Sequence, residues 1–249
     1  MNKMKQYSLL IISAVASILL ICASVAFSGS ISEMTGEDYE KVSWGGLLYD
    51  NWYSVLGVKT GGSHPSYPKD GQQKGGTTWR CKECHGWDYQ GKDGAYAMGS
   101  HFTGIKGIRQ SAGMDPEVIA TVLKADTHTF GPVIPEKAYQ ALAYFVAYGQ
   151  IDMDRYIDRS SKKAGGERNN GAKIFLSTCA KCHGMDGKKI NFKTPDKPEY
   201  LGTVANKNPW ETLHKIRYGQ PDTEMVNLLF LTIEDQIDML SYCQSLPVE

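Results

Sequence analysis

Two stretches of the chain repeat one pattern, Arg80-Cys81-Lys82-Glu83-Cys84-His85-Gly86 and Thr178-Cys179-Ala180-Lys181-Cys182-His183-Gly184. In each stretch two thiols are separated by two residues and are followed at once by an imidazole and a glycine. A lone Cys-x-x-Cys also occurs in redox dithiols and in zinc sites. The adjoining histidine and the second copy of the pattern make both of those interpretations less favoured here. The two stretches therefore predict two copies of one site.

Cys-x-x-Cys-His is the attachment pattern of c-type haem. The thiols add across the two vinyl groups of the haem, and the short turn places the histidine as an axial ligand of the iron. The four cysteines predicted to hold the haems are Cys81, Cys84, Cys179 and Cys182, and the predicted proximal ligands are His85 and His183. A zinc site would need two more soft ligands in each copy, and the sequence has no spare Cys or His there.

The overall composition is that of a globular protein. The chain has 249 residues with 27 basic and 27 acidic side chains, so it lacks the basic excess of nucleic-acid-binding proteins. Of its six cysteines, Cys22 and Cys243 lie outside the two motifs, which leaves no disulfide framework. We expect no nucleic acid among the partners.

The N-terminus has the features of a targeting segment. Lys3 and Lys5 precede an uncharged run from Leu9 to Phe27, and Ser24-Val25-Ala26 supplies small residues of the kind that signal peptidase cuts after. Residues 1–26 are predicted to be a signal peptide or a membrane anchor, because the apolar run is nearly long enough to span a bilayer. Either alternative places the mature chain in the periplasm or otherwise outside the cytoplasm, where haem is attached to c-type cytochromes.

Changes in composition divide the remainder of the chain. The segment Glu40–Leu56 is predicted to form an amphipathic helix that packs on the first haem module, and Gly57–Thr77 is a long Gly/Pro-rich loop containing His64. Loops of this length are often functional, so we expect this one to meet the haem edge or a partner. The predicted divisions are an N-terminal extension (27–76), a first module (77–149), a charged linker (150–169) and a second module (170–249).

The two modules align at a constant offset of 98 residues, which relates His85 to His183 and Tyr144 to Tyr242. Asp115-Pro116 and Asn208-Pro209 each predict the start of a helix, because proline is favoured in the first turn. The predicted apolar face of the first of these helices is Val118, Ile119, Val122 and Leu123. The helix that runs into Cys179 is predicted to turn Ala172, Phe175 and Leu176 inward.

On these motifs both modules resemble class I c-type cytochromes, over about residues 77–247. In that family Cys-x-x-Cys-His-Gly ends a first helix, an axial methionine precedes a C-terminal helix, and an aromatic residue of that helix packs on the first helix. The resemblance implies an all-α fold of two tandem class I cytochrome c domains. It implies that each domain is a small helical bundle around one covalently bound haem c, two haems in all.

The second module matches the family position of the axial methionine. Met225 lies 42 residues after His183 and 17 before Tyr242, although Val226 stands where the family usually has proline. The alternative role for Met225 is a core side chain. The two other methionines in this module, Met185 and Met239, fit the position less well.

The first module has no methionine at the corresponding place, where His128 stands 43 residues after His85. His128 is therefore predicted to be the sixth ligand, which would give a bis-histidine iron. Other candidates are His101, Met98 or Met114, and an open iron is a further alternative.

These ligands favour an electron carrier over an enzyme. The predicted function is extracytoplasmic electron transfer, in which the chain shuttles single electrons between a redox enzyme as donor and a further acceptor. One alternative is a dihaem oxidoreductase similar to thiosulfate dehydrogenase, with catalysis at the first haem, but those proteins typically carry an unusual ligand such as cysteine and this module has no further cysteine. Another is a cytochrome subunit of a larger dehydrogenase, docked through residues 39–76. Because axial methionine raises the potential of a haem, the first haem is expected to have the lower potential.

Overall fold

The computed structural model of the protein describes residues 34–248 and is mostly helical. The predicted targeting segment 1–26 lies outside these residues. Within residues 34–248, no helix is both long and apolar enough to cross a membrane.

The α-helices and strands, in chain order, are α2 (Gly36–Val55), α3 (Cys81–His85), α4 (Pro116–Leu123), α5 (Glu136–Tyr144), β1 (Ile157–Asp158), β2 (Lys163–Ala164), α6 (Arg168–Thr178), α7 (Ala180–His183), α8 (Leu201–Lys207), α9 (Pro209–Tyr218) and α10 (Ile233–Cys243). Short 3-10 turns occupy Gly75–Trp79, Arg109–Ser111, Gly131–Val133 and Met153–Arg155, and a π-helical turn, Phe145–Gly149, continues α5. Asp115 caps α4 and Asn208 caps α9 through their side chains, with proline in the first turn of each, as the sequence predicts.

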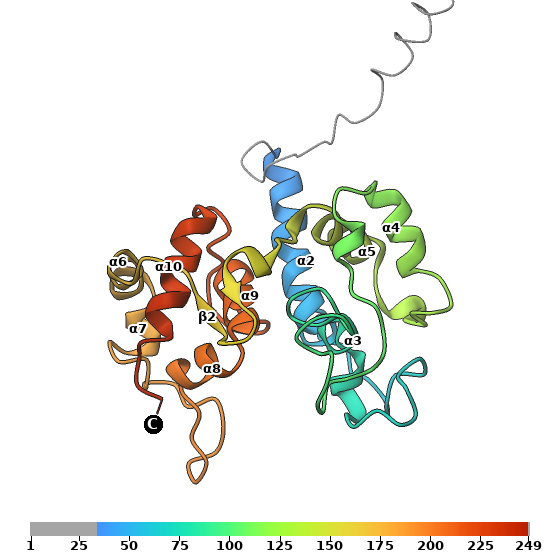
Figure 1. Cartoon of the computed structure of the whole chain (residues 1–249). Coiled ribbons are helices and arrows are strands. Elements are labelled where there is room, and N and C mark those ends of the chain that lie inside the picture. Colours follow the sequence, from blue (N-terminus) through green and yellow to red (C-terminus); the bar gives the residue numbers. More distant parts are fainter. Residues whose placement is uncertain (1–33, 249) are drawn as a thin grey trace, which may run out of the picture.

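The second module is held by the crossing of its first and last helices, α6 and α10 (Figure 1). Gly171 of α6 lies against α10 so closely that a Cβ atom there would collide with the carbonyl oxygen of Asp238. Near the other end of α6 the rings of Phe175 and Tyr242 meet with centroids 5.2 Å apart. Glycine thus permits the close approach, and the aromatic pair fills the space beside it.

The first module repeats this crossing with helices α2 and α5. A Cβ atom on Gly45 of α2 would collide with the carbonyl oxygen of Ala141 on α5. Tyr49 and Phe145, which follow along the same contact, have ring centroids 5.0 Å apart. The helix that crosses α5 therefore comes from the N-terminal extension, ahead of the boundary expected at residue 77.

Helix α2 agrees with the helix predicted over Glu40–Leu56 but is not amphipathic. It is buried on two sides because α5 lies on one side and α9 on another (Figure 1). Gly45 faces α5, whereas its neighbour Gly46 faces the ring of Tyr218 on α9. A helix with two covered sides has no single apolar stripe, and α2 is a shared element between the two modules.

Two predicted apolar faces are only partly buried. Val118 and Val122 of α4 are exposed, while Ile119 and Ala120 pack toward the core. Leu176 of α6 is exposed as well, although Phe175 beside it is buried. These helices are short and are covered on one side, so the outer apolar residues were wrongly assigned to the core.

The predicted linker 150–169 is not a loose connection. Its Met153 and Ile157 are fully buried, and β1 pairs with β2 in an antiparallel hairpin. Arg159 bridges the buried Asp88 at 2.8 Å and Asp154 at 2.6 Å. The charges of this segment attach it to both modules: Arg159 pairs with Asp88 of the first, and Lys163 donates to Asn206 Oδ1 of the second at 2.6 Å.

Candidate haem sites

The two Cys-x-x-Cys-His segments fold into the same turn. Gly86 after the first has φ 79° and ψ 157°, and Gly184 after the second has φ 81° and ψ 158°. Such positive φ values are open to glycine and strained for other residues, which explains the glycine in both motifs. The backbone carbonyl of each motif histidine accepts from a loop N–H, Gly91 in the first copy (2.8 Å) and Lys189 in the second (3.0 Å).

The loops that follow the motifs also correspond. The carboxylate of Asp88 accepts from the N–H of Gln90 at 3.2 Å, and that of Asp186 accepts from the N–H of Lys188 at 3.1 Å. Both pairs are related by the offset of 98 residues found in the sequence. The repeat thus extends from the motif residues into local backbone geometry.

The four motif thiols are unpaired, and none forms a disulfide. Burial raises the pKa of Cys81 and of Cys84 to about 12, and that of Cys179 to about 11, so these thiols are protonated at neutral pH. Within residues 34–248, no group of three or more His, Cys, Asp or Glu side chains is arranged to hold a metal ion.

His85 and His128 lie close together in the first module. Their ring centroids are 6.3 Å apart, with an angle of 40° between the ring planes. Nδ1 of His85 lies 2.8 Å from the carbonyl oxygen of Lys106, and Nδ1 of His128 lies 3.1 Å from that of Val122. Because Nδ1 must carry the proton to donate to a carbonyl, Nε2 of each ring keeps its lone pair free for a metal.

This spacing fits one iron between the two rings. An imidazole nitrogen lies about 2 Å from a bound first-row metal and its ring centroid about 1 Å farther, so two axial imidazoles have centroids about 6 Å apart. Burial lowers the pKa of His85 to about 4 and also lowers the pKa of His128, which keeps both rings in the neutral form that ligates.

The other residues predicted as alternatives to His128 lie elsewhere. Nδ1 of His101 is 2.7 Å from the buried Glu83 carboxylate, and its ring stacks on Tyr96 with centroids 4.7 Å apart. Met98 and Met114 are both exposed. The structure thus brings His128, and not these residues, to His85.

In the second module His183 is half-buried, and its Nδ1 is buried without a hydrogen-bond partner in the described part of the chain. Its ring lies 6.3 Å from that of the exposed Phe192. Met225 is partly buried on the segment between α9 and α10, where its N–H donates to Thr223 Oγ1 at 3.2 Å. Ligation by Met225 stays a prediction. Of the two alternative methionines, Met239 is buried in α10 and Met185 is exposed.

Charged and polar side chains join the two modules behind the first motif. The carboxylate of Asp50 on α2 is fully buried and pairs with Arg80, which directly precedes Cys81, and with Lys215 of α9. Burial alone would raise the pKa of Asp50, but the two cations outweigh it and the pKa is lowered.

A second buried contact across the modules uses His214, which no sequence motif singled out. Its Nε2 donates to the Gly46 carbonyl at 3.0 Å, so its Nδ1 accepts from the Tyr89 hydroxyl at 2.9 Å. Complete burial lowers the pKa of His214 to about 3, so the ring stays neutral. These contacts fix the second module on α2 and on the loop after the first motif.

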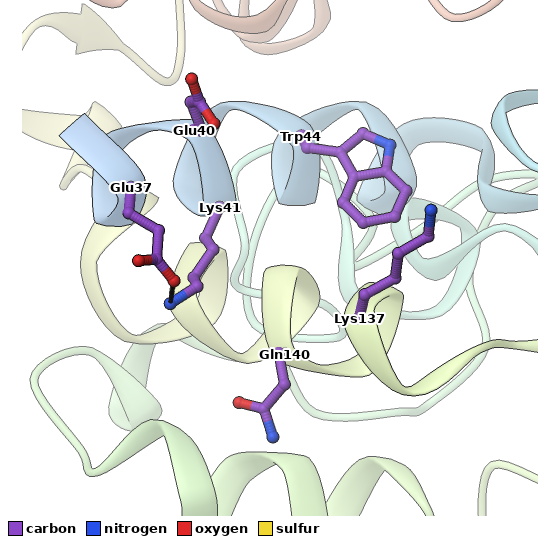
Figure 2. A pocket seen from close by; sticks show the side chains of 6 residues that line it. All are labelled: Glu37, Glu40, Lys41, Trp44, Lys137 and Gln140. Atoms are coloured by element: carbon purple, nitrogen blue, oxygen red, sulfur yellow. Dashed lines mark ion pairs between the residues drawn. The ribbon is translucent and has the colours of Figure 1, made fainter.

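A surface pocket is found away from both motifs, between α2 and α5 (Figure 2). The residues that line it are Glu37, Glu40, Lys41, Trp44, Lys137 and Gln140. It offers no thiol, imidazole or thioether and is therefore not a haem site.

Comparison with known families agrees with the second motif. Residues 169–247 match the family described as Cytochrome c, and this part of the chain is a class I c-type cytochrome domain. A domain of this family implies a covalently bound haem c and an electron-transfer or haem-based redox function. No curated protein matches the chain.

Proposed function

Starting from the cytochrome c domain at residues 169–247, we propose that the chain is a dihaem c-type cytochrome, with a second haem in the first module. It transfers single electrons outside the cytoplasm between a redox protein donor and a further acceptor. The observation that carries the proposal is the pair His85 and His128, whose ring centroids lie 6.3 Å apart. Nδ1 of each ring bonds to a backbone carbonyl, which leaves Nε2 as the nitrogen that can bind a metal.

Two further features support a second cytochrome module. The motif turns share backbone angles at Gly86 and Gly184. In both modules a glycine of the first helix lies against a carbonyl of the last helix, at Gly45 and at Gly171. A zinc or disulfide role for the first motif would explain neither correspondence.

In each module, different residues attach the haem, bind its iron and orient the ligands. The four motif cysteines would hold the haems through thioether bonds. His85 and His128 would bind the iron in the first module, and His183 and Met225 would bind it in the second. When bound, haem supplies an iron that gains and loses one electron at a time. The carbonyl groups of Lys106 and Val122 orient the two imidazoles of the first module through their Nδ1–H groups.

The two ligand sets give the electron path a direction. Bis-histidine ligation produces a lower potential than histidine–methionine ligation. With these ligand sets, electrons would enter at the first module and leave at the second. The buried contacts of Asp50 and His214 keep the two modules in one arrangement during this transfer.

Haem counting tests the proposal. Mass spectrometry of the denatured, purified chain is expected to show two covalently attached haems, and one in the variant in which Cys81 and Cys84 are both replaced by Ala. The double variant at Cys179 and Cys182 is the matched control and should also retain one haem. A wild-type chain that carries a single haem would refute the dihaem proposal.

A further inference from the structure

The long loop between α2 and the first motif places one histidine at the candidate site. His64 is buried, while Ser63, Pro65 and Ser66 around it are exposed. The backbone N–H of His64 donates to the buried Thr78 Oγ1 at 2.8 Å. The loop thus turns the His64 side chain inward.

The tautomer of His64 is fixed by its neighbours. Nδ1 accepts from the N–H of Ser66 at 3.1 Å, so the ring proton is on Nε2. Nε2 then donates to the backbone carbonyl oxygen of His128 at 2.6 Å. The ring edge packs on Trp79 and Phe130, with centroids 4.6 Å and 5.6 Å away, which fixes the direction of this bond.

The segment that carries His128 needs such support. Thr129, the next residue, is β-branched and has φ 46°, in the left-handed region that such residues avoid. Residues 124–127 and Thr129 are exposed, and His128 N–H donates to Ala125 at 3.0 Å. Phe130 is buried and packs on Trp52, so the segment is attached to the core just after His128. His64 supplies an attachment at His128 itself.

The second module has no corresponding loop. Helix α6 ends at Thr178 and leads directly into Cys179, whereas residues 56–80 separate α2 from Cys81. The module with the extra loop is also the one with a histidine in place of the predicted axial methionine.

We propose that His64 is a positioning residue for the first haem: it holds the backbone of His128 so that the His128 ring stays on the iron. This inference rests on the proposed ligation by His85 and His128. It gives the loop 57–76 a function, which is to support the sixth ligand and limit access of small molecules to the iron.

The test measures carbon monoxide binding to the reduced dihaem protein, because carbon monoxide binds the first haem only when His128 leaves the iron. His64→Phe keeps a ring against Trp79 and Phe130 but removes the donor, and should bind carbon monoxide about tenfold faster, the effect of one lost hydrogen bond. His64→Gln keeps a donor and should behave as wild type. Gln73→Ala removes a hydrogen bond of the same loop to Ser100 that does not touch His128, and is the control.

The results distinguish the role of His64 from ligation of the first haem by His128. His128→Ala should give a high-spin first haem and fast carbon monoxide binding, and if it changes neither, ligation by His128 is wrong. If His128→Ala has this effect, two results would refute only the role of His64. One is carbon monoxide binding by His64→Phe at the wild-type rate. The other is binding by His64→Gln as fast as by His64→Phe. The electron paramagnetic resonance signal of the second haem reports whether each variant is folded. If His64→Phe is not folded, His64→Ala is compared with His64→Gln in its place.

Discussion

Replacing the buried carboxylate of Asp50 with an amide should destabilise the whole protein. Asp50→Asn keeps the size of the side chain and removes its charge, which leaves Arg80 and Lys215 facing each other without an anion. The side chain of Asp50 is 1% exposed, and those of Arg80 and Lys215 are 22% and 14% exposed. Breaking a buried ion pair costs about 3–5 kcal/mol, and since Asn still accepts a hydrogen bond we expect about 3 kcal/mol.

An exposed ion pair provides the matched control. Lys92 and Asp93 are 44% and 63% exposed, so Asp93→Asn should change the free energy of unfolding by less than about 1 kcal/mol. Urea unfolding of the haem-loaded protein, followed by haem absorbance, measures both variants. Combining Asp50→Asn with Lys215→Met should cost less than the sum of the single substitutions, because the two side chains act as one contact.

The effect of Asp50 should also depend on pH. The pKa of the Asp50 carboxyl is held below its usual 3.8 because the two cations outweigh burial. Its contribution is therefore complete above about pH 4 and is lost as the pH falls through the lowered value, where wild type and Asp50→Asn should converge. The reasoning fails if Asp50→Asn matches Asp93→Asn at pH 7, or if the gap between wild type and Asp50→Asn widens in acid.

Three other substitutions test separate parts of the structure. Gly45→Ala should lower the free energy of unfolding by about 2 kcal/mol or more, because the added methyl group collides with α5. Gly36→Ala is the control and should cost nothing, because no atom lies within 4 Å of its added Cβ; equal urea midpoints for the two variants would contradict the crossing of α2 and α5. Thr129→Gly should stabilise the protein by up to about 1 kcal/mol in the same assay by relieving its positive φ, and a loss of stability would show that the Thr129 backbone is not strained. Met225→His should lower the higher midpoint in a redox titration toward the other, and an unchanged titration would exclude Met225 as a ligand.

Much of the local structure followed from the sequence because it depends on short-range chemistry. The capped starts of α4 and α9 came from Asp-Pro and Asn-Pro, since a side-chain cap and a first-turn proline act within one turn. The spacing of the Cys-x-x-Cys-His motifs, with glycine next, was sufficient to predict two equivalent turns. His128 was singled out by its position in the repeat, and the structure brings it to His85.

The particular contacts between segments far apart in the chain could not be predicted from the sequence. The sequence predicted that the helix of residues 40–56 packs on the first module, but not that it crosses α5. The loop 57–76 shifts this helix away from the constant offset, which would place it near residues 70–80. Gly45 and Gly46 gave no apolar signal, although their lack of a side chain is what allows both modules to approach α2. Nothing in the pattern around His64 or His214 pointed to their partners, which lie 64 and 168 residues away.

Low-temperature electron paramagnetic resonance of the fully oxidised protein tests the central claim most directly, because it reports the axial ligands of every haem at once. The account predicts two low-spin ferric signals of equal intensity, one from a bis-histidine haem that is lost in His128→Ala and one from a histidine–methionine haem that is lost in Met225→Ala. A single low-spin signal that accounts for all the iron, or a high-spin signal from the first haem of the wild-type protein, would contradict it.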